Sequence, residues 1–212
     1  MRTITRNPNP PACLTQQPPG QKWDDFKGDC HRQVGNSLRA EQYHVCCYCE
    51  VEITENNSHI EHMAPRSIRP DHVYDYNNLA ASCNGGWIEH CGHFKDNRSR
   101  NPNYRYDPDV FCLPHEPGTT TLFQYLPTGT VIPAPGLHGD DRQKADYMIG
   151  YLGLNCARLT GRRRAHARQL ITTLGTNPAT ELVQWAVGYY VNPDPQNKLR
   201  QFPSLSKKML NQ

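Results

Sequence analysis

Cysteines crowd into one interval of the chain. Of the nine cysteines, five lie between residues 46 and 91, at positions 46, 47, 49, 83 and 91. Cys46 and Cys49 form a Cys-x-x-Cys pair, and their two-residue gap closes a chelate ring more readily than the one-residue gap from Cys47. The spacing predicts a closed, structural four-thiolate Zn²⁺ site on Cys46, Cys49, Cys83 and Cys91, with buried free thiols as the alternative.

A carboxylate and an imidazole stand side by side between the two cysteine pairs. Glu61 and His62 belong to the run Ser58-His-Ile-Glu-His-Met-Ala-Pro65, and neighbouring side chains on a strand point to opposite faces. One of them could therefore hold a hard cation while the other activates water. His93 follows on a predicted short helix, with Asn97 four residues later on the same face.

We expect Glu61 and His93 to share a Mg²⁺ or Mn²⁺ ion, with His62 facing the line of attack on a phosphate. His59 is the next candidate base if His62 is not the one. Taken singly, each histidine has an ordinary structural role as its alternative. The combination within one short interval is what indicates a catalytic site.

This order of motifs resembles the HNH nucleases, which have a ββα-metal fold. The resemblance covers residues 44–98 and rests on the runs CCYCE, HIEHMAPRS, YDYNNLAASC and CGHFKDN. It implies that Glu61 is the acidic metal ligand, His62 the general base, Asn78 the support of the base and its loop, and His93 the last metal ligand, with Lys95 nearby. The last ligand commonly follows the final cysteine directly, but Gly92 stands there, so His93 and Asn97 both stay candidates.

Features outside this interval extend the resemblance to the HNH subunit of retron and Septu-type antiphage systems. They are an N-terminal arm, a helix that contains tryptophan, and a C-terminal helical segment with a Leu-Asn pair. The resemblance implies a toxic nuclease of the bacterial cytoplasm, activated on phage infection, and a partner ATPase. We expect a nucleic-acid substrate, DNA before RNA, although phosphate contacts and one metal ion suit both. The alternative is a zinc-stabilised nucleic-acid-binding or partner-binding module without catalysis.

Composition argues against a membrane protein and points to a basic C-terminal region. Hydrophobic residues make up 36% of the 212 residues, no apolar run approaches the roughly 20 residues of a spanning helix, and the first residues hold no apolar signal segment. Net charge is +3, but residues 142–212 carry 11 basic and 3 acidic side chains, against 12 and 17 in residues 1–141. We expect one helix face to bind a polyanion, with a solvated face as the alternative. That face contains Arg158, Arg162, Arg163, Arg164 and Arg168.

Four segments are expected to position these residues in an α+β fold. Residues 1–43 form an extended arm (1–20) and an amphipathic helix (21–42); residues 44–98 form the zinc-stabilised nuclease core. Residues 99–140 hold loops and a hairpin over 122–132, and residues 141–212 form the basic helical region. In the core we expect strands over 51–53 and 59–62, a loop over 64–90 and a helix from Cys91. Helices are expected over 141–152 and 155–174, with a third that begins at Asn177 and Pro178 and is capped by Asn177.

Overall fold

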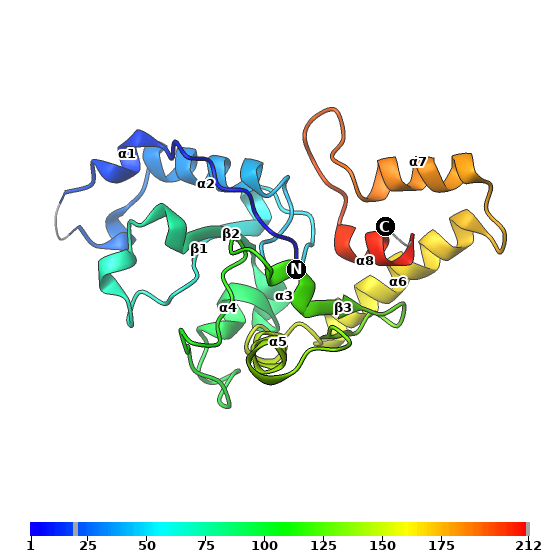
Figure 1. The fold of residues 1–212 in the computed structure, drawn as a ribbon. Helices are drawn as coiled ribbons and strands as arrows, with labels where there is room; N and C mark the ends of the chain where they lie inside the picture. The colour runs from blue at the N-terminus through cyan, green and yellow to red at the C-terminus, as the bar shows by residue number, and fades with distance from the viewer. Residues whose placement is uncertain (19–20, 211–212) are drawn as a thin grey trace.

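The chain combines small antiparallel sheets with helices, an α+β architecture (Figure 1). A computed structural model describes residues 1–18 and 21–210, so positions 19 and 20 of the predicted arm lie outside the described part. On one side of the molecule, α1 (Ala12–Thr15) and α2 (Asp29–Glu41) lie beside β1 (Ser58–His62) and β2 (Leu79–Cys83). On the opposite side lie α6 (Ala157–Leu174), α7 (Thr180–Tyr190) and α8 (Pro203–Met209).

The central hairpin pairs β1 with β2, in a register that sets Glu61 opposite Ala80 and His62 opposite Leu79. The strand predicted over 59–62 is confirmed, but its predicted partner over 51–53 is wrong. Residues 51–53 instead fold back on the cysteine knuckle, where Val45 and Glu52 form an isolated bridge. The partner strand lies within the predicted loop over 64–90. Its residues are all buried, so it lacks the alternation of polar and apolar residues that reveals a half-exposed strand.

Two short helical turns follow the hairpin. α3 (Gly85–Ile88) is irregular, because its residues have positive φ angles, including 68° at Trp87. α4 (Cys91–Lys95) begins where the sequence predicted a helix and packs against β2. The arrangement of β1, β2 and α4 is consistent with a ββα core.

The N-terminal region differs from the single helix predicted over 21–42. Residues Trp23–Asp25 form a short 3₁₀ turn, η1, and α2 begins only at Asp29. Gly28 has a φ of 79°, a left-handed conformation that interrupts a helix and that glycine adopts without strain. A disulfide joins Cys13 and Cys30 and so ties α1 to α2. The sequence did not predict it, because disulfides are uncommon in the reducing compartment expected for the protein.

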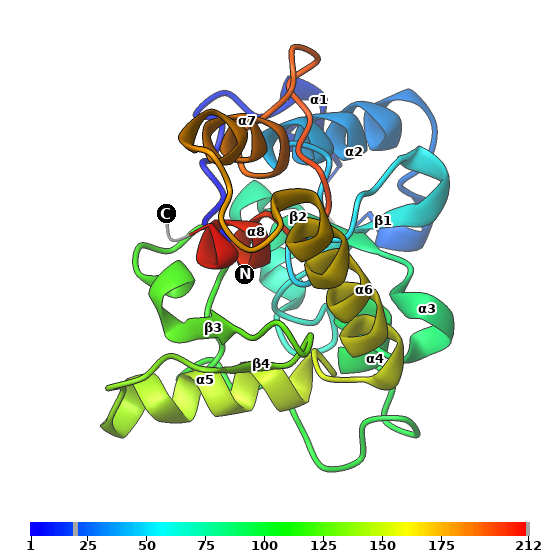
Figure 2. The same ribbon diagram turned by 90° about the vertical axis from the view of Figure 1, so that its right-hand side faces the viewer.

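The C-terminal helices follow the sequence more closely. α5 (Gly139–Tyr151) packs along the hairpin of β3 (Phe123–Tyr125) and β4 (Val131–Pro133), and both were expected (Figure 2). α6 ends before Gly175, as predicted. α7 begins at Thr180 after Ala179, so the expectation that Asn177 caps this helix is wrong. α8 was not predicted; its proline at the first turn suits a helix start.

One apolar core draws residues from Met1 to Leu205, and a second cluster joins α6, α7 and α8 around Leu170, Ala186 and Tyr190. The site described below lies where the central hairpin meets α4, at the edge of the larger core. Across residues 1–18 and 21–210, no helix has both the length and the apolar character that crossing a bilayer requires.

Candidate metal centre and active site

Four buried cysteine side chains converge on one point. The Sγ atoms of Cys46, Cys49, Cys83 and Cys91 all lie within 4.8 Å of one another. The Cys46–Cys91 and Cys49–Cys83 sulfur distances are 3.8 and 3.6 Å. A tetrahedron with Zn–S bonds of about 2.3 Å has edges of about 3.8 Å. The four thiols are therefore positioned to bind a metal such as zinc.

Three parts of the core supply these ligands. The knuckle after α2 gives Cys46 and Cys49, the end of β2 gives Cys83, and the start of α4 gives Cys91. Cys47 is buried but lies outside the cluster, as the spacing argument predicted, and burial raises the pKa of its thiol. The Cys83 amide donates to Cys46 Sγ at 3.3 Å, a contact that suits a thiolate.

A buried cation lies behind the cluster. The Arg163 side chain on α6 is 0% exposed; its Nη1 donates to the Leu154 carbonyl at 2.6 Å, while Nε and Nη2 have no hydrogen-bond partner. Burial lowers the pKa of Arg163, and the thiol groups of Cys49 and Cys91 act in the opposite direction. Four thiolates around one Zn²⁺ would carry a net negative charge, which a buried guanidinium with two unpaired N–H groups fits.

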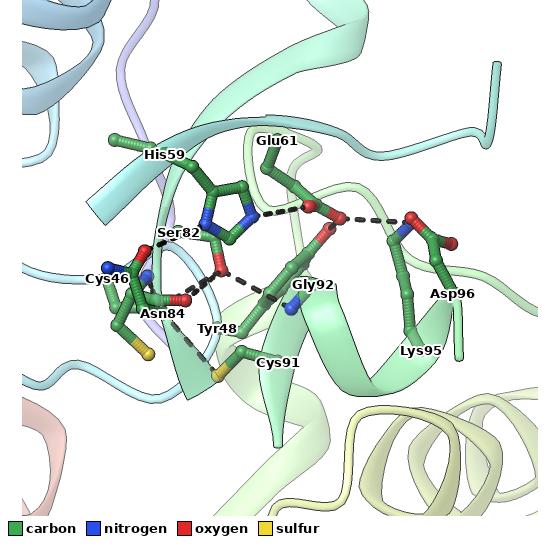
Figure 3. Close-up of polar contacts among 12 residues, drawn as sticks. Cys46, Tyr48, His59, Glu61, Ser82, Asn84, Cys91, Gly92, Lys95 and Asp96 are labelled. Carbon is green, nitrogen blue, oxygen red and sulfur yellow. Dashed lines mark hydrogen bonds and ion pairs between the residues drawn. The ribbon is translucent and has the colours of Figure 1, made fainter. Parts of the chain in front are cut away.

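Glu61 lies at the centre of a chain of charges in which Glu61 and Lys95 are buried (Figure 3). Its Oε2 is 3.2 Å from His59 Nε2, and its Oε1 is 3.0 Å from Lys95 Nζ, which lies 2.7 Å from Asp96 Oδ1. Burial alone would raise the pKa of Glu61, but the charge of Lys95 and the contact with His59 outweigh it and lower the pKa to about 2. Glu61 is therefore ionised at neutral pH.

His59 connects Glu61 to His93. The imidazole rings of His59 and His93 stack with centroids 4.0 Å apart and planes 7° apart. Burial acts to lower the pKa of His59, but its hydrogen bond to Glu61 raises the pKa on balance. Asn97 lies apart from this group, because its Oδ1 accepts from the amides of Ser99 and Arg100 at 3.1 and 3.0 Å. The geometry favours His93 over Asn97 as the partner of Glu61.

The oxygen and nitrogen ligands are less tightly gathered than the sulfurs. Within the described ranges, the four cysteines are the one group of three or more cysteine, histidine or carboxylate side chains whose ligand atoms all lie within 4.8 Å. Glu61, His59 and His93 are nevertheless neighbours. Glu61 offers the carboxylate that Mg²⁺ and Mn²⁺ prefer, and the two histidines offer imidazole, which suits transition-metal ions. Lys95 contacts Oε1 of Glu61, whereas Oε2 faces His59.

Gly92 lets α4 approach Glu61. A Cβ atom built at position 92 would lie 2.6 Å from the Glu61 carboxyl carbon, which is shorter than real Cβ contacts are. The glycine between Cys91 and His93 thus leaves room for the Glu61 carboxylate against the first turn of α4. This explains in steric terms why His93 follows the final cysteine at the second position.

His62 lies on the other face of β1. Its Nε2 is 3.0 Å from the Val73 carbonyl oxygen, so Nε2 carries the proton and Nδ1 keeps a free lone pair. The indole of Trp23 covers the ring edge-on, with centroids 4.4 Å apart. Burial lowers the pKa of His62 to about 4, which leaves the imidazole neutral at pH 7.

Asn78 ties together the two ends of the loop that follows β1. Its Oδ1 accepts from the Ala64 amide at 2.7 Å, and its Nδ2 donates to the carbonyls of Ala64 and His72 at 3.1 and 3.2 Å. The second carbonyl directly precedes Val73, whose own carbonyl orients His62. Asn78 therefore lies one residue from the group that fixes the imidazole.

The basic face of α6 is smaller than predicted. The prediction is wrong for Arg163, because that side chain turns into the core to lie near the thiols of Cys49 and Cys91. Arg158 pairs with Glu89 at 3.2 Å, and Arg162 donates to Gln201 at 2.7 Å. The exposed side chains of Arg164 and Arg168 make no ion pair or hydrogen bond with any described residue. Two of the five arginines are thus free for an external anion.

Comparison with known proteins identifies one informative relative. The chain is 26% identical over 155 residues to a protein of Vibrio cholerae serotype O1 biovar El Tor named "Retron Vc95 putative HNH endonuclease"; the alignment covers 71% of this chain and 70% of that protein. The likeness is to a protein whose name places it among the HNH endonucleases. No protein-family model matches the chain. The relative agrees with the family that the motif order resembles.

Three contributors to the site were not assigned their roles from the sequence. His59 could have been placed beside Glu61, since residues two apart on a strand share a face. The Val73 carbonyl is a backbone group and carries no sequence signal. Trp23 reaches His62 because the helix is interrupted at Gly28, which separates η1 from α2.

Proposed function

We propose that this chain is a metal-dependent HNH endonuclease that hydrolyses phosphodiester bonds of nucleic acid, DNA before RNA. The observation that carries the proposal is that the two faces of β1 present different chemical groups. An ionised carboxylate with two imidazoles lies on one face, and a neutral, oriented histidine lies on the other. The name of the Vibrio cholerae relative supports the same reaction class.

The Glu61 face would hold the catalytic cation. Glu61 provides the carboxylate, and His93, with His59 beside it, provides imidazole nitrogen. A Mg²⁺ or Mn²⁺ ion bound there supplies charge neutralisation for the phosphate and stabilisation of the leaving oxygen. The four cysteines would hold a structural Zn²⁺ that takes no part in the chemistry, because a tetrahedral four-thiolate site has no open position.

The His62 face would activate water. A neutral imidazole can accept a proton, and Nδ1 is the free nitrogen because Nε2 donates to the Val73 carbonyl. Asn78 acts as a positioning residue, since it fixes the loop that presents this carbonyl. Trp23 packs edge-on against the ring and is part of the burial that lowers its pKa.

We further propose that the nuclease is the toxic effector of a bacterial antiphage system and works in the cytoplasm with a partner ATPase. The word retron in the relative's name supports the defence context, and the ATPase follows from the family resemblance. Arg164 and Arg168 would contact nucleic-acid backbone without reading sequence.

The test is cleavage by purified protein with Mg²⁺ or Mn²⁺ on plasmid, single-stranded DNA and total RNA. We expect His62→Ala to reduce the rate by about 10²- to 10⁴-fold, as loss of a general base does, with fold and zinc content intact. His115→Ala is the matched control, because burial also lowers the pKa of His115 to about 4 outside the site. Full activity of His62→Ala would exclude His62 as the base; no cleavage by the wild type would favour a binding module.

A further inference from the structure

A pocket of about 360 Å³ opens beside the candidate active site. Its walls are the loop that follows β1, the C-terminal end of α4 and the loop over residues 101–106. Two of its lining residues connect it to the site: Lys95 pairs with Glu61, and Arg66 lies four residues after His62. The volume falls at the lower end of the roughly 300–1,000 Å³ of ligand sites. The function proposed above assigns no role to this pocket.

The pocket holds positive charge that the protein does not fully neutralise. Among its basic residues, Lys95 is matched by Glu61 and Asp96, and Arg66 is matched by Asp24 at 2.9 Å. Arg98 makes no side-chain ion pair or hydrogen bond with the residues that the structure describes. The guanidinium of Arg105 donates only to the Pro102 and Tyr104 carbonyls, at 3.0 and 2.7 Å. Two guanidinium groups at the pocket therefore lack a carboxylate partner.

Two tyrosine rings line the same pocket as these charges. Tyr104 and Tyr106 line the pocket and are half-buried. Each is held from behind by another ring, Tyr104 by Tyr147 at 6.1 Å and Tyr106 by Phe111 at 5.4 Å between centroids. Each ring therefore has an aromatic packing partner within the fold.

Aromatic rings beside arginines that have no carboxylate partner are a combination that binds nucleotides outside a base pair. A base stacks on the ring, and the guanidinium groups take the phosphate. Bases of an intact duplex are already stacked on their neighbours and cannot enter a pocket without being turned out, which costs a few kcal/mol. The composition of this pocket therefore selects single-stranded or locally unpaired substrate.

We propose that the pocket binds one unpaired nucleotide of the substrate next to the bond that is cleaved. Its base stacks on Tyr106, and its phosphate binds Arg98 and Arg105. The proposal rests on the nuclease function proposed above, to which it adds a substrate class: single-stranded or unpaired nucleic acid, whether DNA or RNA.

Binding is measured in the His62→Ala background, so that cleavage does not interfere. The probes are a fluorescent 20-nucleotide single strand and the blunt duplex of the same sequence. We expect Tyr106→Leu to weaken binding of the single strand by about 5- to 150-fold, the loss of one stacked base, and to leave duplex binding unchanged. Tyr106→Phe keeps the ring and should bind as the parent does. Tyr189→Leu, which removes a half-exposed ring on α7 that lies outside the pocket, is the control.

Substitutions of exposed arginines test the proposal without disturbing the packing around Tyr106. Arg98→Ala and Arg105→Ala should each lower the slope of log affinity against log salt on the single strand by about 0.7, the contribution of one phosphate contact. Arg32→Ala, an exposed arginine on α2, should leave the slope unchanged. Unchanged single-strand binding by Tyr106→Leu and both arginine variants would overturn the proposal, as would equal losses on single strand and duplex.

Cleavage distinguishes failure of this proposal from failure of the nuclease assignment. If the wild type cleaves no substrate, the nuclease assignment fails. If it cleaves, and Tyr106→Leu in an otherwise native chain keeps the same preference between single strand and duplex, the assignment stands and the pocket proposal fails.

Discussion

Lys95 and Glu61 form an ion pair of 3.0 Å in which the lysine side chain is 0% and the glutamate side chain 3% exposed. Removing one partner of a buried pair leaves the other charge uncompensated. Glu61 is also the carboxylate proposed to bind the catalytic cation. Lys95 and a divalent cation would therefore compete for the negative charge of the same carboxylate.

We expect Lys95→Met to lower the free energy of unfolding by about 3–5 kcal/mol in buffer without added divalent cations. Added Mn²⁺ should raise the Tm of this variant more than that of the wild type, because it replaces the missing positive charge. Lys208→Met, on the exposed side of α8, is the control. Equal Mn²⁺ shifts in all three proteins would contradict the competition.

Gly92→Ala should displace Glu61 from α4. The added methyl group overlaps the carboxylate, and forced overpacking typically costs about 1–3 kcal/mol of stability. Cleavage should fall with it, because Glu61 and His93 move apart. Gly161→Ala on α6 meets no atom within 4 Å and should be neutral or stabilising by up to about 1 kcal/mol. Wild-type cleavage by Gly92→Ala would show that this close approach is not needed.

Elemental analysis should find one zinc per folded chain. A structural zinc contributes directly to folding, so a strong chelator should unfold the core, and Cys91→Ser should lose the metal. Cys112→Ser changes a buried cysteine outside the cluster and should keep it. Folded wild-type protein without zinc would refute the site.

Neutralising Arg164 and Arg168 to glutamine should weaken nucleic-acid binding equally for all sequences. The salt dependence should flatten by about one unit of slope for each phosphate group that the protein no longer neutralises. Arg142→Gln with Lys144→Gln, on α5, removes the same charge elsewhere. An unchanged slope would assign this face to a protein partner or to solvent.

His166 should make stability depend on pH. Its Nε2 lies within hydrogen-bond distance, 2.8 Å, of Ser206 Oγ and joins α6 to α8, and burial lowers its pKa below 6.5. Below pH 6.5 the unfolded chain takes up a proton that the folded chain does not, so stability is lost as pH falls. His166→Gln should therefore lose less stability than the wild type between pH 7 and 5 in urea unfolding. The exposed His138→Gln should behave as the wild type; identical losses in all three would exclude this contribution.

Much of the site could be predicted because its residues lie close together in the sequence. The cysteine spacing correctly selected Cys46 over Cys47, and the alternation of strand side chains separated Glu61 from His62. The roles proposed for Glu61, His62, Asn78 and His93 stay predictions. What could not be predicted depends on contacts across the fold. The strand β2 is buried on both faces, so its sequence shows no alternation of polar and apolar residues. Trp23 contacts His62 because the helix predicted over 21–42 is interrupted at Gly28.

Arg163 shows a second limit of sequence reasoning. Five arginines in one helical stretch predict a basic surface, since buried arginines are rare. The local pattern cannot show that one of them turns inward, because its hydrogen-bond partners include the Gly129 carbonyl, which is distant in the chain. Helix ends marked by glycine, such as Gly175 after α6, were predicted correctly because their cause is local.

The register of β1 against β2 limits where residues can be inserted or deleted during evolution. Side chains alternate along β1, so an inserted or deleted residue between positions 59 and 62 would exchange the faces of Glu61 and His62. Insertions between Cys49 and Ser58, or in the loop over 64–75, leave that alternation intact. In homologous chains, length should therefore vary in those two loops, while the spacing of the histidine, glutamate and histidine at positions 59, 61 and 62 should stay fixed even where the surrounding residues have diverged.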